Sequence, residues 1–217
     1  MGALGGIFFD RDGTLCENGT GYLGGPGKIV LVGDAAKVLA AMSRAGYLLF
    51  LVTNQSGVGR GYFPAGSAHR CNRRLEELLG GGKIFQEICV SIGTSGRPDP
   101  YRKPSPRFLL EMCARYMLEP ARCWVIGDSP CDGEMAERAG ARAILIESGL
   151  GVETASKNAS RWRVPDLTAA WDLIRLWDGA NAHPDPADGC GKNSSGTEPH
   201  KFACDGGPAL FSVGHGQ

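Results

Sequence analysis

Short apolar runs alternate with segments of helical periodicity through residue 178, and this alternation constrains the fold more than any other feature. The apolar runs predict five buried strands, at residues 7–10, 48–53, 87–92, 124–128 and 143–147. The segments between and after them predict helices at residues 35–46, 107–118, 130–139 and 165–177. Continuously apolar strands joined by helices are typical of a parallel sheet covered on both faces. The sequence therefore predicts an α/β fold built on a doubly wound parallel sheet.

The composition changes after this region. Residues 179–217 are rich in Gly, Pro, Asp and Ser and have no periodicity, so we expect a disordered tail behind a single domain of residues 1–178. The tail contains three His and two Cys residues, but their spacing matches no zinc motif. The chain's eight Cys residues show no paired spacing, which favours reduced thiols.

The overall charge gives no sign of an extended anionic partner. Lys and Arg together number 23, as do Asp and Glu, so the net charge is zero and nucleic acid or membrane binding is not expected. The sequence also has no apolar stretch long enough for a membrane helix and no signal-peptide pattern at its start. We expect a soluble cytoplasmic protein whose oligomeric state is open, a monomer included.

Polar side chains follow the predicted strands at the points where these end. They are Asp10, Asp12, Thr53, Asn54, Gln55, Asp128 and Asp132, with Lys103 in the loop before a predicted helix. Because ligands bind at the carboxyl ends of parallel strands, we expect these side chains to converge. Carboxylates at close quarters repel one another unless they share a cation, and Mg²⁺ prefers such oxygen ligands while leaving room for a phosphate. The pattern predicts a site for magnesium and a phosphate group.

The pair Asp10 and Asp12 also suggests a reaction. One carboxylate can attack phosphorus to form an aspartyl-phosphate, and the other can protonate the leaving alcohol and later deprotonate water. At a strand end, residues two positions apart point the same way, and Gly13 then allows a sharp turn. Each motif taken alone could be a turn, a helix cap or a solvated loop; their order and spacing together favour a catalytic site.

Four segments of the chain resemble the four motifs of the haloacid dehalogenase (HAD) phosphatase superfamily. They are DRDGT at residues 10–14, VTNQSG at 52–57, RKP at 102–104 and GDSPCD at 127–132. The first three look most like subgroup IIIA, which contains heptose bisphosphate phosphatases, histidinol-phosphate phosphatases and the phosphatase domain of polynucleotide kinase-phosphatase. The resemblance covers roughly residues 7–151 and implies a magnesium-dependent phosphomonoesterase with a HAD-like Rossmannoid fold.

The resemblance also implies a role for each matching residue. Asp10 would be the nucleophile and Asp12 the general acid and base. Magnesium would be held by the carboxylates of Asp10 and Asp128 and the backbone carbonyl of Asp12. Thr53 and Lys103 would bind the phosphate, and Asp132 would support the metal and Lys103. Substrate contacts would come from Asn54, Gln55, Ser56 and Arg102. No role follows for Arg11.

Two features of the sequence bear on the expected specificity. Many relatives of this subgroup carry a zinc loop with a Cys-x-His pair and a Cys-x-Cys pair before RKP. Here Cys89 matches the first ligand, but Ser91, Asp99 and Tyr101 stand at the others, so zinc is not expected. The roughly 40 to 50 residues between the first and second motifs, and again between the second and third, also leave no room for a large cap domain.

The hypothesis that the sequence favours is hydrolysis of a small phosphorylated metabolite, with a heptose bisphosphate as the leading substrate. Histidinol phosphate is an alternative within the same subgroup. A nucleic-acid 3′-phosphatase is suggested by the segment NQSGVGRG, but the neutral charge and the absence of a basic stripe stand against it. A HAD-like scaffold that binds phosphate without turnover is a further alternative.

Overall fold

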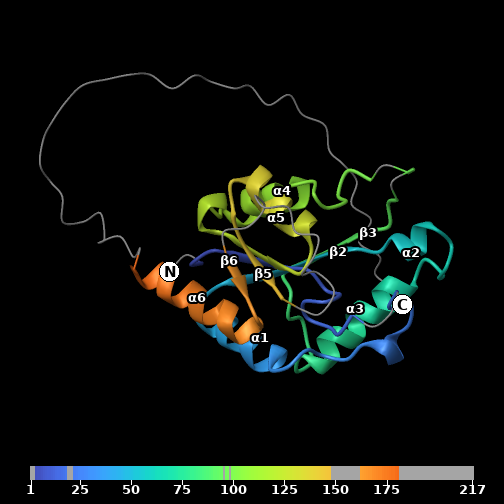
Figure 1. The fold of residues 1–217 in the computed structure, drawn as a ribbon, viewed down its shortest axis with the longest axis horizontal. Helices are drawn as coiled ribbons and strands as arrows, with labels where there is room; N and C mark the ends of the chain where they lie inside the picture. Colours follow the sequence, from blue (N-terminus) through green and yellow to red (C-terminus); the bar gives the residue numbers. More distant parts are fainter. Residues whose placement is uncertain (1–2, 19–21, 95, 98, 148–161, 181–217) are drawn as a thin grey trace, which may run out of the picture. The chain divides into compact units, whose positions relative to one another are not determined.

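The computed structural model describes residues 3–18, 22–94, 96–97, 99–147 and 162–180, and within them the chain builds one parallel sheet (Figure 1). The six strands follow the spatial order β3-β2-β1-β4-β5-β6, and every neighbouring pair is parallel. They are β1 Gly6–Phe9, β2 Leu48–Asn54, β3 Glu87–Ser91, β4 Trp124–Gly127, β5 Arg142–Ile146 and β6 Trp162–Val164. The predicted doubly wound parallel sheet is confirmed, and the five predicted strands are all present.

Strand β6 was not predicted. It has three residues and pairs with β5 at the edge of the sheet. Exposed Arg163 lies between half-buried Trp162 and buried Val164, so the segment has no continuous apolar run. A strand this short carries too little periodicity to distinguish it from a loop.

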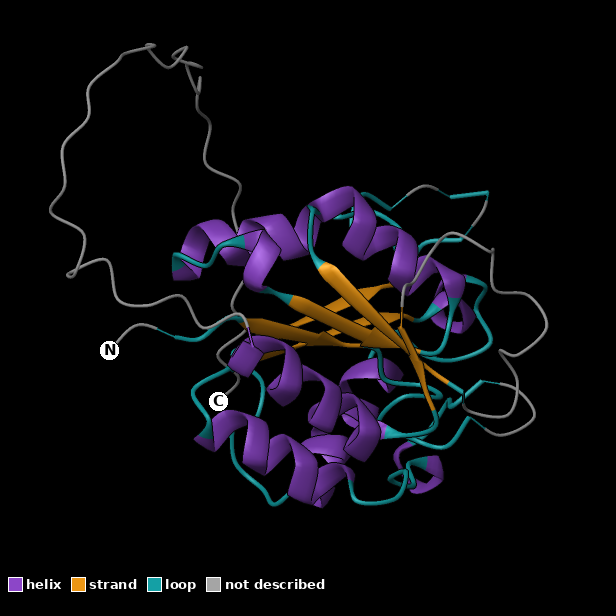
Figure 2. Cartoon of the chain, turned by 60° about the vertical axis from the view of Figure 1, so that its left-hand side comes forward, coloured by secondary structure: helices purple, strands orange, loops and turns teal. Residues whose placement is uncertain are grey.

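Helices cover both faces of the sheet (Figure 2). They are α1 Ala35–Arg44, α2 Ser56–Gly59, α3 Ser67–Leu78, α4 Arg107–Tyr116, α5 Pro130–Ala139 and α6 Leu167–Ala180, with 3-10 turns η1 Pro26–Lys28 and η2 Pro120–Arg122. Helix α5 ends where predicted, at Ala139, and the next residue, Gly140, has a left-handed φ of 71°. Asp34 directly precedes α1, but its carboxylate accepts a hydrogen bond from Lys37 and does not cap the helix.

The strand residues alternate between two apolar cores. Ile7 and Phe9 of β1 pack in one core with residues of α1, α3 and α6, whereas Phe8 packs in the other with residues of α4 and α5. This alternation follows from the period of two along a strand. Burial on both faces explains why β1 reads as a continuously apolar run.

The order of the strands places a ligand-binding edge beside β1. The chain steps outward from β1 to β2 and β3, then returns to place β4 on the other side of β1. Phe9, the last residue of β1, is level with Leu51 and Ile126. The backbone N–H of Asp10 donates to Ile126 O at 2.9 Å, so this residue leaves the sheet next to the end of β4. Such a switch point is where open parallel sheets bind ligands.

The connections near this edge contain no folded insertion in the described part of the chain. The connection between β1 and β2 contains η1 and α1, and the connection between β2 and β3 contains α2 and α3. Helix α6 runs to Ala180, two residues past the predicted domain end, so residues 179–180 of the predicted tail are helical. The rest of the predicted tail lies outside the described residues. None of the described helices has the length and apolarity needed to cross a membrane.

Candidate active site

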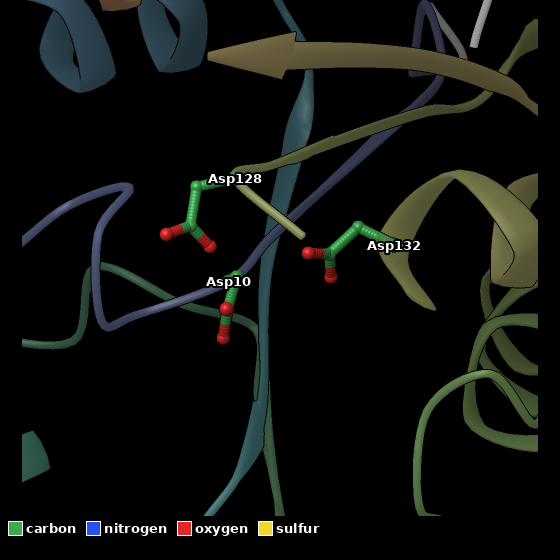
Figure 3. A group of neighbouring side chains, drawn as sticks. All are labelled: Asp10, Asp128 and Asp132. Atoms are coloured by element: carbon green, nitrogen blue, oxygen red, sulfur yellow. The ribbon is translucent and has the colours of Figure 1, made fainter. Parts of the chain in front are cut away.

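Three carboxylates converge at the carboxyl end of the sheet (Figure 3). Asp10 follows β1, Asp128 follows β4, and Asp132 lies in the first turn of α5. One carboxylate oxygen from each lies within 4.8 Å of the others. Asp132 is fixed by a capping box, in which Ser129 N–H donates to Asp132 Oδ2 at 3.2 Å. Hard oxygen donors grouped in this way suit a divalent cation such as Mg²⁺.

A buried ammonium group lies against this cluster. Lys103 Nζ is 2.8 Å from Asp10 Oδ1 and 2.7 Å from Asp132 Oδ1, and its side chain is 1% exposed. Burial by itself would lower the pKa of Lys103, but the charges of Asp10 and Asp132 raise it, so the side chain stays protonated. One ammonium thus faces three carboxylates, which leaves the site short of positive charge.

The pKa values of two of the carboxylates are raised. Burial raises the pKa of Asp10 to about 7, with Asp132 and Asp12 adding to the rise and Lys103 opposing it. Burial likewise raises the pKa of Asp128 to about 6, with a further contribution from Asp132. A shared cation would favour the ionised forms and relieve this strain.

Asn54 holds the segment that carries Lys103. Its Nδ2 donates to Lys103 O at 3.1 Å, and Lys103 N–H donates back to Asn54 Oδ1 at 3.0 Å. This reciprocal pair ties the end of β2 to the loop before α4. Ser56, another of the residues expected to contact substrate, begins the short helix α2. A direct substrate contact of either residue stays a prediction.

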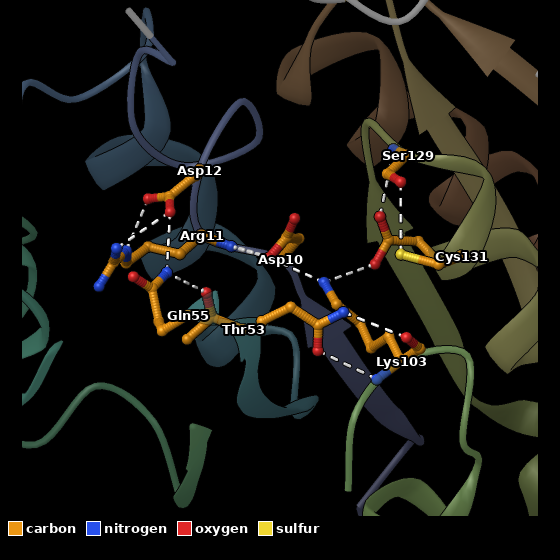
Figure 4. A network of polar contacts seen from close by, with 10 residues as sticks. Asp10, Arg11, Asp12, Thr53, Gln55, Lys103, Ser129 and Cys131 are labelled. Atoms are coloured by element: carbon orange, nitrogen blue, oxygen red, sulfur yellow. Dashed lines mark hydrogen bonds and ion pairs between the residues drawn. The ribbon is translucent and has the colours of Figure 1, made fainter. Parts of the chain in front are cut away.

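Asp12 lies in a second polar network beside the first (Figure 4). Its carboxylate accepts hydrogen bonds from Arg11 Nε at 2.7 Å and Arg11 Nη2 at 3.0 Å. Gln55 Nε2 is 2.8 Å from Asp12 Oδ2 and also 2.8 Å from Thr53 Oγ1. The two aspartates of the motif therefore have different cationic partners, and Gln55 connects Asp12 with Thr53.

Arg11 is the functional candidate that sequence reasoning missed. Its side chain is fully buried, and it is among the largest buried side chains in the described residues. An arginine directly after an apolar strand and between two aspartates offered one signal, because a buried guanidinium needs carboxylate partners. Its further partner, Asn72 of α3, is 61 positions away and carries no local signal.

Gly13 explains how the loop after β1 approaches β4 so closely. Its φ of 83° is left-handed, and a Cβ at this position would lie 1.9 Å from Asp128 Oδ2. A side chain here would therefore occupy the space of a clustered carboxylate. The glycine of the DRDGT motif both turns the chain and leaves room for Asp128.

The loop before Lys103 is organised by a carboxylate. Asp99 accepts hydrogen bonds from Ser91 Oγ at 2.8 Å, Gly93 N–H at 3.3 Å and Tyr101 N–H at 2.8 Å. Arg102 Nη1 donates to Gly93 O at 2.8 Å. Three positions that would supply zinc ligands in many relatives thus contact one another through hydrogen bonds. The absence of zinc and a substrate contact of Arg102 stay predictions.

The chain is similar in sequence to known phosphatases. A model of the HAD-hydrolase-like family matches residues 100–170, the part that contains Lys103, Asp128 and Asp132. The chain is 30% identical to a D-glycero-beta-D-manno-heptose-1,7-bisphosphate 7-phosphatase of Pseudomonas putida over 168 residues, which cover 76% of this chain and 93% of that protein. It is 35% identical to the protein of the same name from Mesorhizobium japonicum over 156 residues, 68% of this chain and 71% of the relative.

Solved structures share the fold. A D,D-heptose 1,7-bisphosphate phosphatase from B. bronchiseptica, crystallised with magnesium and phosphate, matches with a TM-score of 0.71 and 23% identity over 80% of this chain and 99% of that one. A HAD-like phosphatase structure from Mesorhizobium loti matches with a TM-score of 0.65 and 31% identity, over 81% of this chain and 88% of that one. The predicted fold and family resemblance are both confirmed.

Proposed function

Since the chain belongs to the haloacid dehalogenase phosphatases, we propose that it is a magnesium-dependent phosphomonoesterase that acts on a small phosphorylated sugar through an aspartyl-phosphate. The observation that carries the proposal is the position of Asp10. Its carboxylate lies at the end of β1 among three groups that suit a phosphoryl transfer site: Asp128, Asp132 and the Lys103 ammonium.

The residues at this edge fit a magnesium ion. The carboxylates of Asp10 and Asp128, with the backbone carbonyl of Asp12, would hold it, and Asp132 would support the site together with Lys103. The close approach of Gly13 to Asp128 keeps this space open for the carboxylate. When bound, the ion would offset the carboxylate charge and polarise a phosphoryl oxygen.

The protein's own residues account for each bond in the reaction. An Asp10 oxygen attacks phosphorus, the ester P–O bond breaks, and Asp12 donates its proton to the leaving alcohol. Water then attacks the phosphorus of the aspartyl-phosphate, Asp12 accepts a proton from it, and inorganic phosphate leaves with Asp10 restored. Lys103 and Thr53 donate hydrogen bonds to phosphoryl oxygens throughout.

The leading substrate is a heptose bisphosphate. The similarity to D-glycero-beta-D-manno-heptose-1,7-bisphosphate 7-phosphatases at 30–35% identity over most of their length supports this class. The loop of residues 91–102 departs from the zinc-binding pattern of many relatives, so the preferred sugar is a matter for direct measurement.

Phosphate release from a panel of substrates tests the proposal. The panel contains heptose bisphosphates, other sugar phosphates, histidinol phosphate and a 3′-phosphorylated oligonucleotide, each with Mg²⁺ and with EDTA. We expect the fastest release from a sugar phosphate, a requirement for Mg²⁺, and a loss of at least about 10³-fold in Asp10→Asn. Asp34→Asn, which removes an exposed carboxylate paired with Lys37, is the matched control and should keep full activity.

Two results would count against the proposal. Turnover by Asp10→Asn at the wild-type rate would show that Asp10 is not the nucleophile. Binding of phosphate with Mg²⁺ but no turnover of any panel member would instead point to a non-catalytic scaffold. Capture of labelled phosphate on Asp10 after rapid quenching would support the aspartyl-phosphate directly.

A further inference from the structure

The arginine between the two motif aspartates contacts both of them. Arg11 N–H donates to Asp10 Oδ1 at 2.7 Å, while its guanidinium binds the Asp12 carboxylate through two nitrogens. We propose that Arg11 is a positioning residue that holds the Asp12 carboxylate in the orientation from which it transfers protons. This inference rests on the proposed function, because it takes Asp12 as the general acid and base.

The contact between Arg11 and Asp12 is a two-point clamp. Arg11 Nε lies 2.7 Å from Asp12 Oδ1, and Arg11 Nη2 lies 3.0 Å from Asp12 Oδ2. The planar guanidinium matches the two carboxylate oxygens, so a rotation of the Asp12 side chain breaks both hydrogen bonds together. A lysine would keep the charge but offer no such planar fork.

The clamp is itself anchored. Arg11 is fully buried, and its third nitrogen, Nη1, donates to Asn72 Oδ1 at 2.9 Å. Asn72 is buried in α3, which packs against the sheet face that also buries Ile7 and Phe9. Because all three nitrogens of the guanidinium donate hydrogen bonds, the group has little freedom to move. The Asp12 carboxylate that it binds is restrained in turn.

The clamped carboxylate is connected to the phosphate-binding side of the site. Gln55 Nε2 lies 2.8 Å from both Asp12 Oδ2 and Thr53 Oγ1. In the proposed function, Thr53 donates to the phosphate, so Gln55 fixes the acid relative to the group whose ester bond breaks. The clamp and this bridge thus hold Asp12 from two directions.

Stability alone explains this pair poorly. Removing a guanidinium and a carboxylate from water costs much of what their attraction returns, and well-packed apolar residues often serve as well. The Asp12 side chain is also 23% exposed, so the pair reaches the edge of the site instead of closing it off. The Arg11–Asp12 pair loses part of its hydration, but the carboxylate is held in a fixed orientation. A group that transfers protons needs such a fixed orientation.

Two substrates with different leaving groups test the inference. A sugar alcohol needs a proton as it leaves, whereas p-nitrophenolate leaves readily without one. Only the formation of the aspartyl-phosphate depends on the leaving group, and kcat/KM reports this step, whereas the later attack of water is common to both substrates. Arg11→Lys should therefore lower kcat/KM by about 10²-fold for the best sugar phosphate of the panel, but by less than about threefold for p-nitrophenyl phosphate. Asp12→Asn should show the same selectivity, and adding Arg11→Lys to it should lower the rate no further.

A matched control distinguishes a positioning role of Arg11 from a general effect of replacing a paired arginine. Arg142→Lys alters another arginine that pairs with an aspartate, Asp178, away from the site, and it should leave both substrates unaffected. If Arg11→Lys fails to fold, Asn72→Ala keeps the clamp but removes its anchor, and it should show the same selectivity with a smaller loss.

The outcomes distinguish this inference from the proposed function. If wild-type protein releases no phosphate, or Asp10→Asn is fully active, the proposed function fails. If wild type is active and Asp12→Asn is selective, but Arg11→Lys and Asn72→Ala lower both substrates equally or leave the sugar phosphate rate unchanged, the positioning role of Arg11 is wrong. A rate increase in Arg11→Lys would show that the clamp restrains Asp12 instead of orienting it.

Discussion

Replacing Gly13 with alanine should disable the site through a contact that can be calculated from the structure. The added Cβ would lie 1.9 Å from Asp128 Oδ2, whereas real Cβ contacts are essentially never shorter than 3.0 Å. The Asp128 carboxylate must therefore retreat by about 1.1 Å, or the loop after β1 must move by as much. A displacement of about 1 Å in a catalytic group can cost about 10²-fold in rate.

The same substitution also strains the backbone, and this effect needs its own control. Alanine at the left-handed φ of 83° costs about 1–2 kcal/mol, which lowers Tm by about 2–8 °C in a chain of this size. Gly140 has a similar φ of 71° at the end of α5, and a Cβ there meets no atom within 4 Å. Gly140→Ala should therefore show the same loss of Tm without the contact at the site.

Phosphate release and thermal unfolding, measured side by side, check this prediction. We expect Gly13→Ala to lose about 10²-fold in kcat and to need more Mg²⁺ for half-maximal activity, while Gly140→Ala keeps the wild-type rate. Equal losses of activity in the two variants would refute the reasoning, because strain would then suffice. Full activity in Gly13→Ala would show that Asp128 does not need its present position.

Two further predictions concern pH and the loop before Lys103. Burial raises the pKa of Asp10 to about 7 and that of Asp128 to about 6. The metal-free folded protein therefore binds protons at these two carboxylates more tightly than the unfolded chain does. Its free energy of unfolding should fall as pH rises from about 4 to about 7. Thermal unfolding in EDTA should show this fall, weaker in Asp10→Asn, and a Tm that rises over this range would contradict it. Asp99→Asn replaces one of the two carboxylate oxygens with an NH2 group, so at least one of the three donors loses its acceptor. It should raise KM several-fold with kcat within about twofold, whereas Ser105→Ala in the same loop should change neither. If Asp99→Asn lowered kcat alone, the substitution would act through Lys103 and not through substrate binding.

The fold was predictable where burial is continuous. Strands β1, β2 and β4 are buried on both faces, so each leaves an apolar run that the sequence displays directly. The short edge strand β6 was missed because half-buried Trp162 and exposed Arg163 break the pattern. The one-residue differences at the strand ends reflect where Asp10 and Asp128 leave the ladder, which hydrogen bonding decides and hydrophobicity does not.

The candidate site was predictable where residues follow strand ends. Asp10, Asp128 and Lys103 converge because the order of parallel strands brings their loops together, and motif order alone was enough to group them. The contacts of Arg11 could not be read in this way. Its partner Asn72 depends on how α3 packs on the sheet, which no local pattern records.

The two carboxylates of the DRDGT motif contact different cations. Asp10 pairs with Lys103, which the sheet topology brings from 93 positions away, and Asp12 pairs with its immediate neighbour Arg11. The partners differ in kind: the ammonium is a point charge shared with Asp132, whereas the guanidinium is a fork that fixes direction. A nucleophile needs charge balance as phosphate arrives, and an acid needs orientation toward the leaving oxygen, so the two cations match the two roles proposed for the aspartates.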